Sequence, residues 1–165
     1  MKLFFHLIFG NYSPPAIIYQ PVEKSPITVV SRGIFKLGPN NYSGYARLRN
    51  INLDWGSASQ GYIAAFKTIG GTVATTVSGK TFVLPSTDKI IVFARFSSSI
   101  EISKLSFDLQ PTKFTHKPSL PQINLEIQRL QLLPGGADFR VAGVIKNLTP
   151  FSIKEVYLPV LLYNA

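Results

Sequence analysis

The chain contains no cysteine, which excludes disulfide bonds, cysteine zinc ligands and thiol catalysis. Only two histidines are present, His6 and His116, and neither lies beside a carboxylate or a second histidine in the sequence. A metal site or a histidine general base is therefore not expected. The sequence also has no run of about 18 or more apolar residues, so no transmembrane segment is expected.

Acidic residues are scarce, because the chain has 17 Lys and Arg against 8 Asp and Glu and carries a net charge of +9. Such a surplus attracts nucleic acid, anionic lipid or acidic cell-wall polymer. The basic residues are scattered along the chain, and scattered charge is typical of a solvated surface. An anionic cell-wall polymer is retained as a partner to test, and no specific nucleic acid is predicted.

The sequence also lacks the common motifs of catalytic, metal-binding and phosphate-binding sites. The carboxylates form neither a D-x-D nor an E-x-x-H arrangement, and neither G-x-S-x-G nor a P-loop occurs. No catalytic residue, cofactor or metal ligand is predicted, and the chain is predicted not to be an enzyme. A sandwich-fold glycan enzyme stays as the least supported alternative, because its two carboxylates could come from distant parts of the sequence.

Val, Ile, Thr, Tyr and Phe are abundant, and these residues favour strands over helices. The 12 Gly and 12 Pro are spread along the chain and supply turns between short strands. Strand-like runs with turn signals every ~8–12 residues, and no convincing helical periodicity, predict an all-β fold. The specific class predicted is an immunoglobulin-like antiparallel β-sandwich.

Residues 42–50 show the clearest strand pattern, because apolar and polar residues alternate. One face carries Tyr42, Gly44, Ala46 and Leu48, and the other carries Ser43, Tyr45, Arg47 and Arg49. The second face brings an aromatic and two basic side chains together, so Tyr45, Arg47 and Arg49 form a candidate ligand face. Such a face can stack sugars or bases or hold phosphate. An ordinary solvated sheet face is the alternative, and we favour it.

Other patterns give local predictions. Ser78-Gly79 is a turn signal between short strands, and Lys89–Phe96, which is apolar on both faces, is typical of a central strand. Shifts in the alternation of apolar residues predict β-bulges near Ser103-Lys104 and Gln128-Arg129. Trp55, the only tryptophan, is expected to cap one end of the sandwich rather than to bind a ligand from an exposed loop.

A faint internal repeat organises the chain. Residues 29–68 align without a gap on residues 126–165 at an offset of 97, which places Leu48-Arg49-Asn50-Ile51 on Ile145-Lys146-Asn147-Leu148. The first copy continues through further strand-like sequence, whereas the second stops at Ala165. The chain is therefore expected to hold one complete β-domain and roughly half of another, as a fragment of a tandem repeat would.

Proline-rich stretches mark the expected domain boundaries. Residues 1–22 are predicted to be an N-terminal apolar segment and a Pro-rich linker, residues 23–117 the first sandwich domain, and residues 118–165 a second, truncated domain. Pro111–Pro121 is predicted to link the two domains.

Half a sandwich leaves strand edges unpaired and apolar side chains uncovered. The uncovered side chains of the second copy are expected to include Val156, Leu158, Val160 and Leu162. We therefore expect the second domain to pack on the first, to pair with another protein chain through its open strand edges, or to belong to a longer protein.

Both copies place a basic residue and an asparagine at the end of an alternating strand, and a further strand follows a variable loop. The second copy reads Lys146-Asn147-Leu148-Thr149-Pro150-Phe151 and continues to Val160-Leu161-Leu162-Tyr163-Asn164. This pattern resembles bacterial FxLYD-type immunoglobulin-like domains and is similar to late-embryogenesis-abundant type 2 (WHy) domains. It departs from the FxLYD pattern at Val160, which stands for the Phe, and at Asn164, which stands for the Asp. The residues that carry the motif are Asn50, Phe66, Asn147, Leu162 and Tyr163.

The resemblance implies a secreted or envelope-attached β-sandwich module and implies no activity. Asn50 and Asn147 are expected to bond to the backbone at the corner between strand and loop, and they would tolerate a left-handed backbone there. Leu162 is expected in the core, and Phe66 and Tyr163 are expected to cover a sheet face.

We therefore predict a non-catalytic module, located outside the cell or in the cell envelope, that serves as a structural spacer or an interaction domain. The alternative is a surface protein that binds polyanions or glycans through its basic sheet face.

Overall fold

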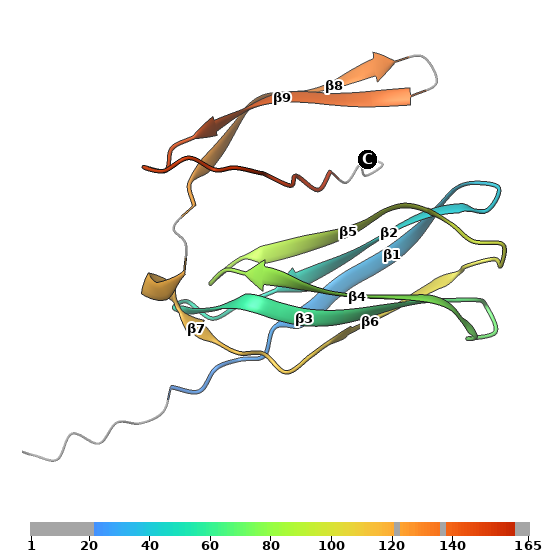
Figure 1. Cartoon of the computed structure of the whole chain (residues 1–165), viewed down its shortest axis with the longest axis horizontal. Coiled ribbons are helices and arrows are strands. Elements are labelled where there is room, and N and C mark those ends of the chain that lie inside the picture. The colour runs from blue at the N-terminus through green and yellow to red at the C-terminus, as the bar shows by residue number, and fades with distance from the viewer. Residues whose placement is uncertain (1–21, 121–122, 136–137, 161–165) are drawn as a thin grey trace, which may run out of the picture.

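The computed structural model describes residues 22–120, 123–135 and 138–160 (Figure 1). Strands dominate these ranges, so the predicted all-β class is confirmed. The strands are β1 (Thr28–Gly38), β2 (Asn41–Arg49), β3 (Trp55–Lys67), β4 (Val73–Val83), β5 (Asp88–Ser97), β6 (Lys104–Leu109), β7 (Thr115–His116), β8 (Leu125–Gly135) and β9 (Asp138–Asn147). Within the described ranges one 3-10 turn, η1 (Lys117–Ser119), directly follows β7. No helix in the described residues is long and apolar enough to cross a membrane.

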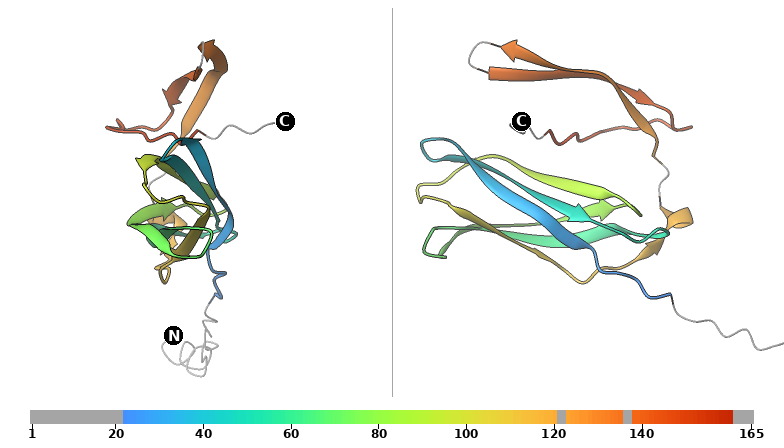
Figure 2. Two further views of the ribbon diagram at one scale, coloured as in Figure 1. Left: turned by 90° about the vertical axis from the view of Figure 1, so that its right-hand side faces the viewer. Right: turned by 180° about the vertical axis from the view of Figure 1, so that it is seen from behind.

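Strands β1 to β6 form an antiparallel sandwich of two layers. One layer has the strand order β1-β2-β5, and the other has the order β4-β3-β6, with the short strand β7 also paired to β3. Strands β8 and β9 form a separate hairpin. Figures 1 and 2 show this hairpin above the sandwich, with the chain that follows β9 running between the two.

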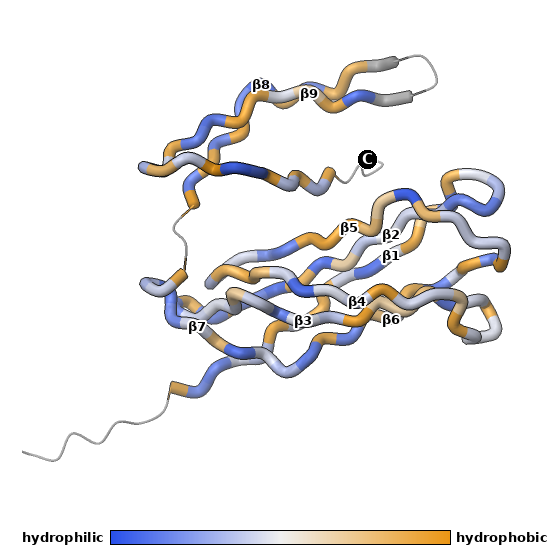
Figure 3. The backbone as a smooth tube through the Cα atoms, viewed as in Figure 1, coloured by the Kyte–Doolittle hydropathy of each residue, from blue (hydrophilic) through white to orange (hydrophobic). Residues whose placement is uncertain are grey.

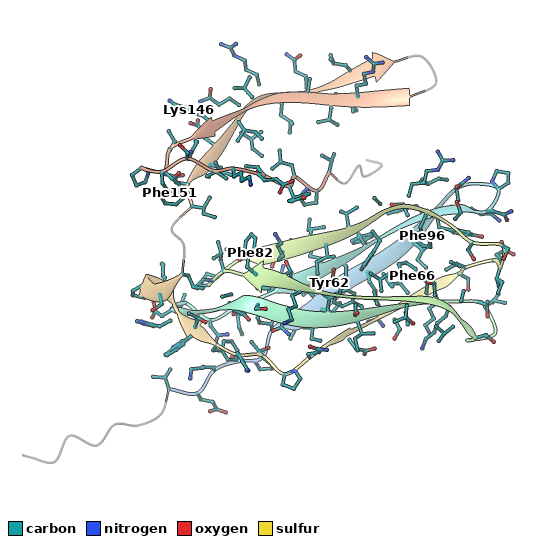
Figure 4. All side chains as sticks on the ribbon, viewed as in Figure 1. Tyr62, Phe66, Phe82, Phe96, Lys146 and Phe151 are labelled. Atoms are coloured by element: carbon teal, nitrogen blue, oxygen red, sulfur yellow. The ribbon has the colours of Figure 1, made fainter. Side chains whose placement is uncertain are left out.

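Alternation of apolar and polar residues places the core between the two layers. Figure 3 shows the alternation along the strands, and in β2 the even-numbered positions from Tyr42 to Leu48 are buried as predicted. Aromatic rings fill the centre of the sandwich. The ring centroid of Phe66 lies 5.3 Å from that of Phe93 and 4.6 Å from that of Phe96 (Figure 4). A fully buried side chain such as Phe66 contributes about 1.5–3 kcal/mol by leaving water, so this cluster stabilises the sandwich.

The hairpin β8–β9 repeats the hairpin β1–β2. Strands β8 and β9 begin 97 residues after β1 and β2, at the offset of the sequence alignment. The last pair before the turn is Gly38 with Asn41 in the first hairpin and Gly135 with Asp138 in the second. The two hairpins therefore share their strand starts and the number of residues between their strands, and β9 continues one residue further than β2.

The predicted turn at Ser78-Gly79 is wrong, because β4 continues through both residues as one strand. The glycine serves a close approach instead of a turn. A Cβ added at Gly79 would lie 2.5 Å from the hydroxyl oxygen of Tyr62 and 2.7 Å from its Cζ, and Tyr62 is the residue opposite Gly79 on β3. Gly79 thus leaves room for the Tyr62 side chain.

The segment Lys89–Phe96 was predicted to be a central strand, and this is also wrong. It forms β5, which lies at the edge of its layer beside β2. Ile91 and Phe93 face the core, whereas Val92 faces outward opposite Tyr45 of β2. The second apolar face of β5 therefore belongs to the outer surface of the sheet.

One of the two predicted bulges is confirmed. The register of β8 against β9 shifts between Gln128 and Gln131, and Arg129 between them has a positive φ of 51°. At Ser103-Lys104 no bulge forms, because β6 begins at Lys104. Ile102 is nevertheless buried from the loop before β6, which explains the apparent shift in its alternation.

The predicted linker Pro111–Pro121 is wrong for most of its length. Thr115 and His116 pair with Gly56 and Trp55 as strand β7, and Leu120 is only 5 % exposed. A Cβ added at Gly56 would lie 2.8 Å from Cδ1 of Leu120, so this glycine leaves room for the leucine. The contacts of the sandwich therefore extend to residue 120.

Candidate functional site

The candidate ligand face lies on the outer side of the layer β1-β2-β5. Tyr45, Arg47 and Arg49 alternate with the buried residues of β2, as predicted. The antiparallel register places Asp88 of β5 opposite Arg49, and Ile90 opposite Arg47. The sheet therefore adds a carboxylate to the predicted pair of arginines.

Asp88 holds the two arginines together. Its Oδ2 accepts a hydrogen bond of 2.8 Å from Nε of Arg47, and its Oδ1 accepts one of 2.9 Å from Nε of Arg49. A further bond of 3.0 Å joins Nη2 of Arg49 to Oδ2. The bonds from Arg49 and Arg47 lower the pKa of Asp88 to about 2, so the carboxylate stays ionised at neutral pH. Two guanidinium groups share one carboxylate, and the cluster keeps one net positive charge.

Tyr45 is separated from this ionic cluster. Its ring stacks on the ring of Phe35 in β1, with centroids 5.8 Å apart and planes inclined by 17°. Gly33 lies opposite Tyr45, and a Cβ there would lie 2.7 Å from Cε1 of the tyrosine. The predicted face therefore divides into an ionic group, Arg47 and Arg49 with Asp88, and an aromatic pair. Asp88 and Phe35 could not be found from the spacing within β2, because only the cross-strand register brings them there.

Asn50 forms the expected corner immediately after β2. Its side-chain amide donates hydrogen bonds to the carbonyl oxygens of Trp55, at 2.7 Å, and Leu84, at 3.0 Å. Its Oδ1 accepts a bond of 3.1 Å from the backbone N–H of Asn52. Asn50 is only 1 % exposed, so these bonds satisfy a buried polar side chain and join the loop to the end of β4.

Asn147, the last residue of β9, forms a similar corner. Its amide donates a bond of 2.9 Å to the carbonyl oxygen of Phe151, and its Oδ1 accepts a bond of 2.9 Å from the backbone N–H of Thr149. Neither Asn50 nor Asn147 has the left-handed backbone that the sequence allowed. Unlike Asn50, Asn147 is exposed to solvent. The two corners therefore share local bonds and differ in what surrounds them.

The remaining motif residues are Phe66, Leu162 and Tyr163, and the structure describes only the first of them. Phe66 lies in the centre of the core, at 1 % exposure, where its ring contacts Phe93 of the opposite layer. Its place in β3 makes it face the opposite layer, which an alignment of motif residues does not reveal. Leu162 and Tyr163 lie outside the described residues, so their predicted core and sheet-covering roles stay predictions.

Trp55 packs at one end of the sandwich, in agreement with the expected capping role. Its ring centroid lies 4.9 Å from that of His116 on β7, and Nζ of Lys24 lies 4.2 Å from the indole centroid. The contact with a lysine is of the cation–π kind. Trp55 thus joins the start of β3 to the chain that precedes β1 and to the chain that follows β6.

A groove of about 670 Å³ lies between the sandwich and the segment that follows β9. The sandwich side includes Ile90 and Val92 of β5 and Lys80 of β4, and the other side is formed by residues 157–160. Leu158 and Val160 remain 47 % and 52 % exposed. This segment is therefore only loosely covered by the sandwich.

Comparison of the chain with protein-family models, with curated proteins and with solved structures finds no match.

Proposed function

We propose that this chain is a non-catalytic, immunoglobulin-like β-sandwich module of a secreted or cell-envelope protein and acts as a structural spacer or an interaction domain. The observation that supports it is the repeated hairpin, with the same strand starts 97 residues apart and the same asparagine corner. Repeated units give a protein length and an extended surface for binding, which suits a spacer or an interaction domain. The resemblance to FxLYD-type and WHy domains points in the same direction.

The strand order bears on the immunoglobulin-like part of the proposal. In a constant-type immunoglobulin domain the first, second, fifth and fourth strands share one sheet. Here β1, β2 and β5 share a layer, and β4 pairs with β3 in the opposite layer. The pairing of β5 with β2 is common to both arrangements. We therefore propose a relative of that fold in which the fourth strand has changed sheet.

The location can be tested with the full chain fused at its C-terminus to a phosphatase that becomes active only outside the cytoplasm. Lys2 followed by the largely apolar run Leu3–Phe9 has part of the pattern of a secretory signal. The proposal therefore predicts phosphatase activity in a bacterial host and its loss when Leu7→Arg and Ile8→Arg interrupt this run. Activity equal to that of a cytoplasmic fusion would contradict an envelope location.

The modular part of the proposal is tested separately by hydrogen exchange on the full chain. A sandwich module and a second unit should exchange with different opening free energies. Exchange of all strands in one cooperative step would show that the chain is a single unit and would contradict the proposal.

A second candidate function is polyanion binding by the outer face of β2. It is favoured by the charge of the sandwich, because residues 22–120 contain 12 Lys and Arg and only 5 Asp and Glu. Asp88 also holds Arg47 and Arg49 in place, so less side-chain entropy would be lost on binding. The test is retention on a heparin column at low salt, since binding of this kind weakens steeply as salt rises. Loss of retention in Arg47→Ala/Arg49→Ala, but not in Lys104→Ala/Lys113→Ala, would support a specific face.

A further inference from the structure

The hairpin β8–β9 has one apolar face and one mostly polar face, on which Val144 and Leu133 are the larger apolar exceptions. Cross-strand pairs such as Ile127 with Ile145 and Leu132 with Val141 lie on the apolar face. The pair Glu126 with Lys146 lies on the other face. The apolar side chains are open to solvent, with Ile145 at 40 % exposure. A two-stranded hairpin with such a face is not stable by itself in water and requires a cover.

The first hairpin shows what that cover consists of. Leu48 occupies the place of Ile145 in the repeat, and it is fully buried. Strand β5 pairs with the free edge of β2, and residues of β3 and β6 such as Phe66 and Phe107 close the core from the other layer. Completion of a hairpin of this kind therefore needs one strand at its edge and a second layer over its apolar face.

The segment after β9 corresponds to the strand of the second layer. Residues 152–160 lie 97 positions after residues 55–63, which form the first part of β3. Val156, Leu158 and Val160 are apolar at alternate positions, as in a half-buried strand. In the described residues this segment has no strand assignment, and it faces the sandwich across the groove of about 670 Å³. It is thus an extended piece of chain next to an uncovered hairpin (Figure 1).

We propose that two copies of this chain complete one sandwich from these parts. Each copy contributes β8–β9 to one layer, and its residues 152–160 pair with the free edge of β9 of the partner copy. This segment then takes the place that β5 has beside β2. The result is two layers of three strands each, the arrangement of β1 to β6, with the apolar faces of the two hairpins turned toward each other. The inference rests on the proposed interaction function and names the partner as a second copy.

The distribution of charge favours a second copy as the occupant. Residues 22–120 carry 12 basic and 5 acidic side chains, whereas residues 123–160 carry 4 basic and 3 acidic ones. Two chains that meet through residues 123–160 therefore join nearly neutral surfaces and keep their strongly basic sandwiches apart. The contact is also isologous, because each copy gives a hairpin and receives a segment, and this is the commonest symmetry of homodimers.

The proline in the segment fits the position that the inference gives it. Residues 152–160 would form an edge strand, with one side facing β9 of the partner and the other facing solvent. Pro159 has no backbone N–H and is tolerated in an edge strand where that position points to solvent. We expect a reversible dimer with a dissociation constant of about 1–100 μM.

The test is sedimentation velocity of the full chain over a series of concentrations, with two variants that differ only in the face they change. Ile145→Lys places a charge on the apolar face, and Val144→Lys places the same charge on the opposite face of the same strand. We expect the wild-type chain and Val144→Lys to approach twice the monomer mass as concentration rises. Ile145→Lys should remain monomeric, with a dissociation constant raised at least tenfold. Circular dichroism and Trp55 fluorescence verify that the sandwich is folded in each variant.

Hydrogen exchange gives a second readout that does not depend on a variant. The backbone amides of residues 152–160 should gain protection as concentration passes through the dissociation constant, because they join a strand ladder only in the dimer. A chain that is monomeric at every concentration, or equal weakening by Val144→Lys and Ile145→Lys, overturns the inference. The phosphatase fusion is independent of dimerisation, so a failure of the proposed location and a failure of this inference are separate results.

Discussion

The two hairpins of this chain have the same design and different surroundings. Strands β1–β2 and β8–β9 start 97 residues apart, and in each hairpin two residues separate the strands. Each hairpin also has an asparagine at the end of its second strand whose amide bonds to the loop backbone. Leu48 is fully buried in the first hairpin, and its counterpart Ile145 is 40 % exposed in the second. Similar local sequence thus produces similar local structure, whereas burial depends on strands that come from elsewhere in the chain.

The two asparagine corners differ in how far along the chain their hydrogen-bond partners lie. The corner of Asn50 is closed by the carbonyl oxygen of Leu84, which lies 34 residues further along the chain. The corner of Asn147 is closed by Phe151 and Thr149, which are its near neighbours. Matched substitutions in the two hairpins should therefore have unequal effects.

The largest difference in the free energy of unfolding is expected between substitutions of Leu48 and of its counterpart Ile145. Leu48→Ala removes a fully buried side chain and should lower the free energy of unfolding of the sandwich by about 2–5 kcal/mol. Ile145→Ala removes a half-exposed side chain and should change it by less than about 0.5 kcal/mol in dilute solution. Urea denaturation followed by Trp55 fluorescence measures both. Equal losses would show that the second hairpin already shares a core with the sandwich.

The next largest difference in stability is expected between substitutions of the two corner asparagines, Asn50 and Asn147. Asn50→Ala leaves the carbonyl oxygens of Trp55 and Leu84 without their donor in a buried site, which should cost about 1–3 kcal/mol. Asn147→Ala exposes its former partners to water, so a cost below about 0.5 kcal/mol is expected. Thermal unfolding of the full chain compares the two variants. A large effect of Asn147→Ala would mean that its corner is buried in solution.

Glycine replacements should have opposite signs in the two hairpins, although the two glycines are not equivalent, since Gly143 aligns with Ala46 in the repeat. A Cβ at Gly44 would lie 3.2 Å from the backbone oxygen of Gly33 and 3.2 Å from Cε1 of Phe66, so Gly44→Ala should destabilise the sandwich by about 1 kcal/mol. At Gly143 the nearest atom is Cδ1 of Leu130 at 3.4 Å, which is ordinary contact. Gly143→Ala should therefore stabilise the hairpin by about 0.5 kcal/mol, because it restricts the unfolded chain. Hydrogen exchange resolves the two hairpins, and two effects of the same sign would contradict the expectation.

The smallest difference concerns acid stability. Folding lowers the pKa of Asp88 to about 2, so its ion pairs stabilise the sandwich above the unfolded pKa of about 4. This stabilisation is lost as pH falls from about 4 to about 2. The second hairpin has Val144 in the place of Arg47 and lacks this cluster. The fall in melting temperature over this range should be smaller in Asp88→Asn, and an equal fall in both proteins would show that other groups control it.

Several features of the fold could be predicted because they depend on neighbouring residues. The alternation of residues 42–50, the bulge at Gln128-Arg129 and the backbone bonds of Asn50 and Asn147 all follow from local geometry. The prediction of a turn at Ser78-Gly79 is wrong because glycine is common both in turns and where two chain segments pack closely. Gly79 looks like a turn residue in the sequence, and its purpose is to leave room for the side chain of Tyr62 across the sheet.

The candidate ligand face also has one part that follows from local sequence and another that depends on the tertiary structure. The alternation of side chains along β2 predicts Tyr45, Arg47 and Arg49 on one face. Asp88 and Phe35, in contrast, come from the strands on either side of β2. Their presence changes the chemistry of the face, since Asp88 neutralises one of the two guanidinium charges and Phe35 stacks on the tyrosine.

The sequence by itself determined the all-β class, the inward and outward faces of β2, and the repeat of one hairpin, because strand geometry and turn chemistry act over a few residues. Only the tertiary structure decided which strand lies at an edge, that one carboxylate meets both arginines, and which of the two hairpins is covered. Those outcomes depend on the order of strands in a sheet, and that order is set by the summed packing of residues far apart in the chain.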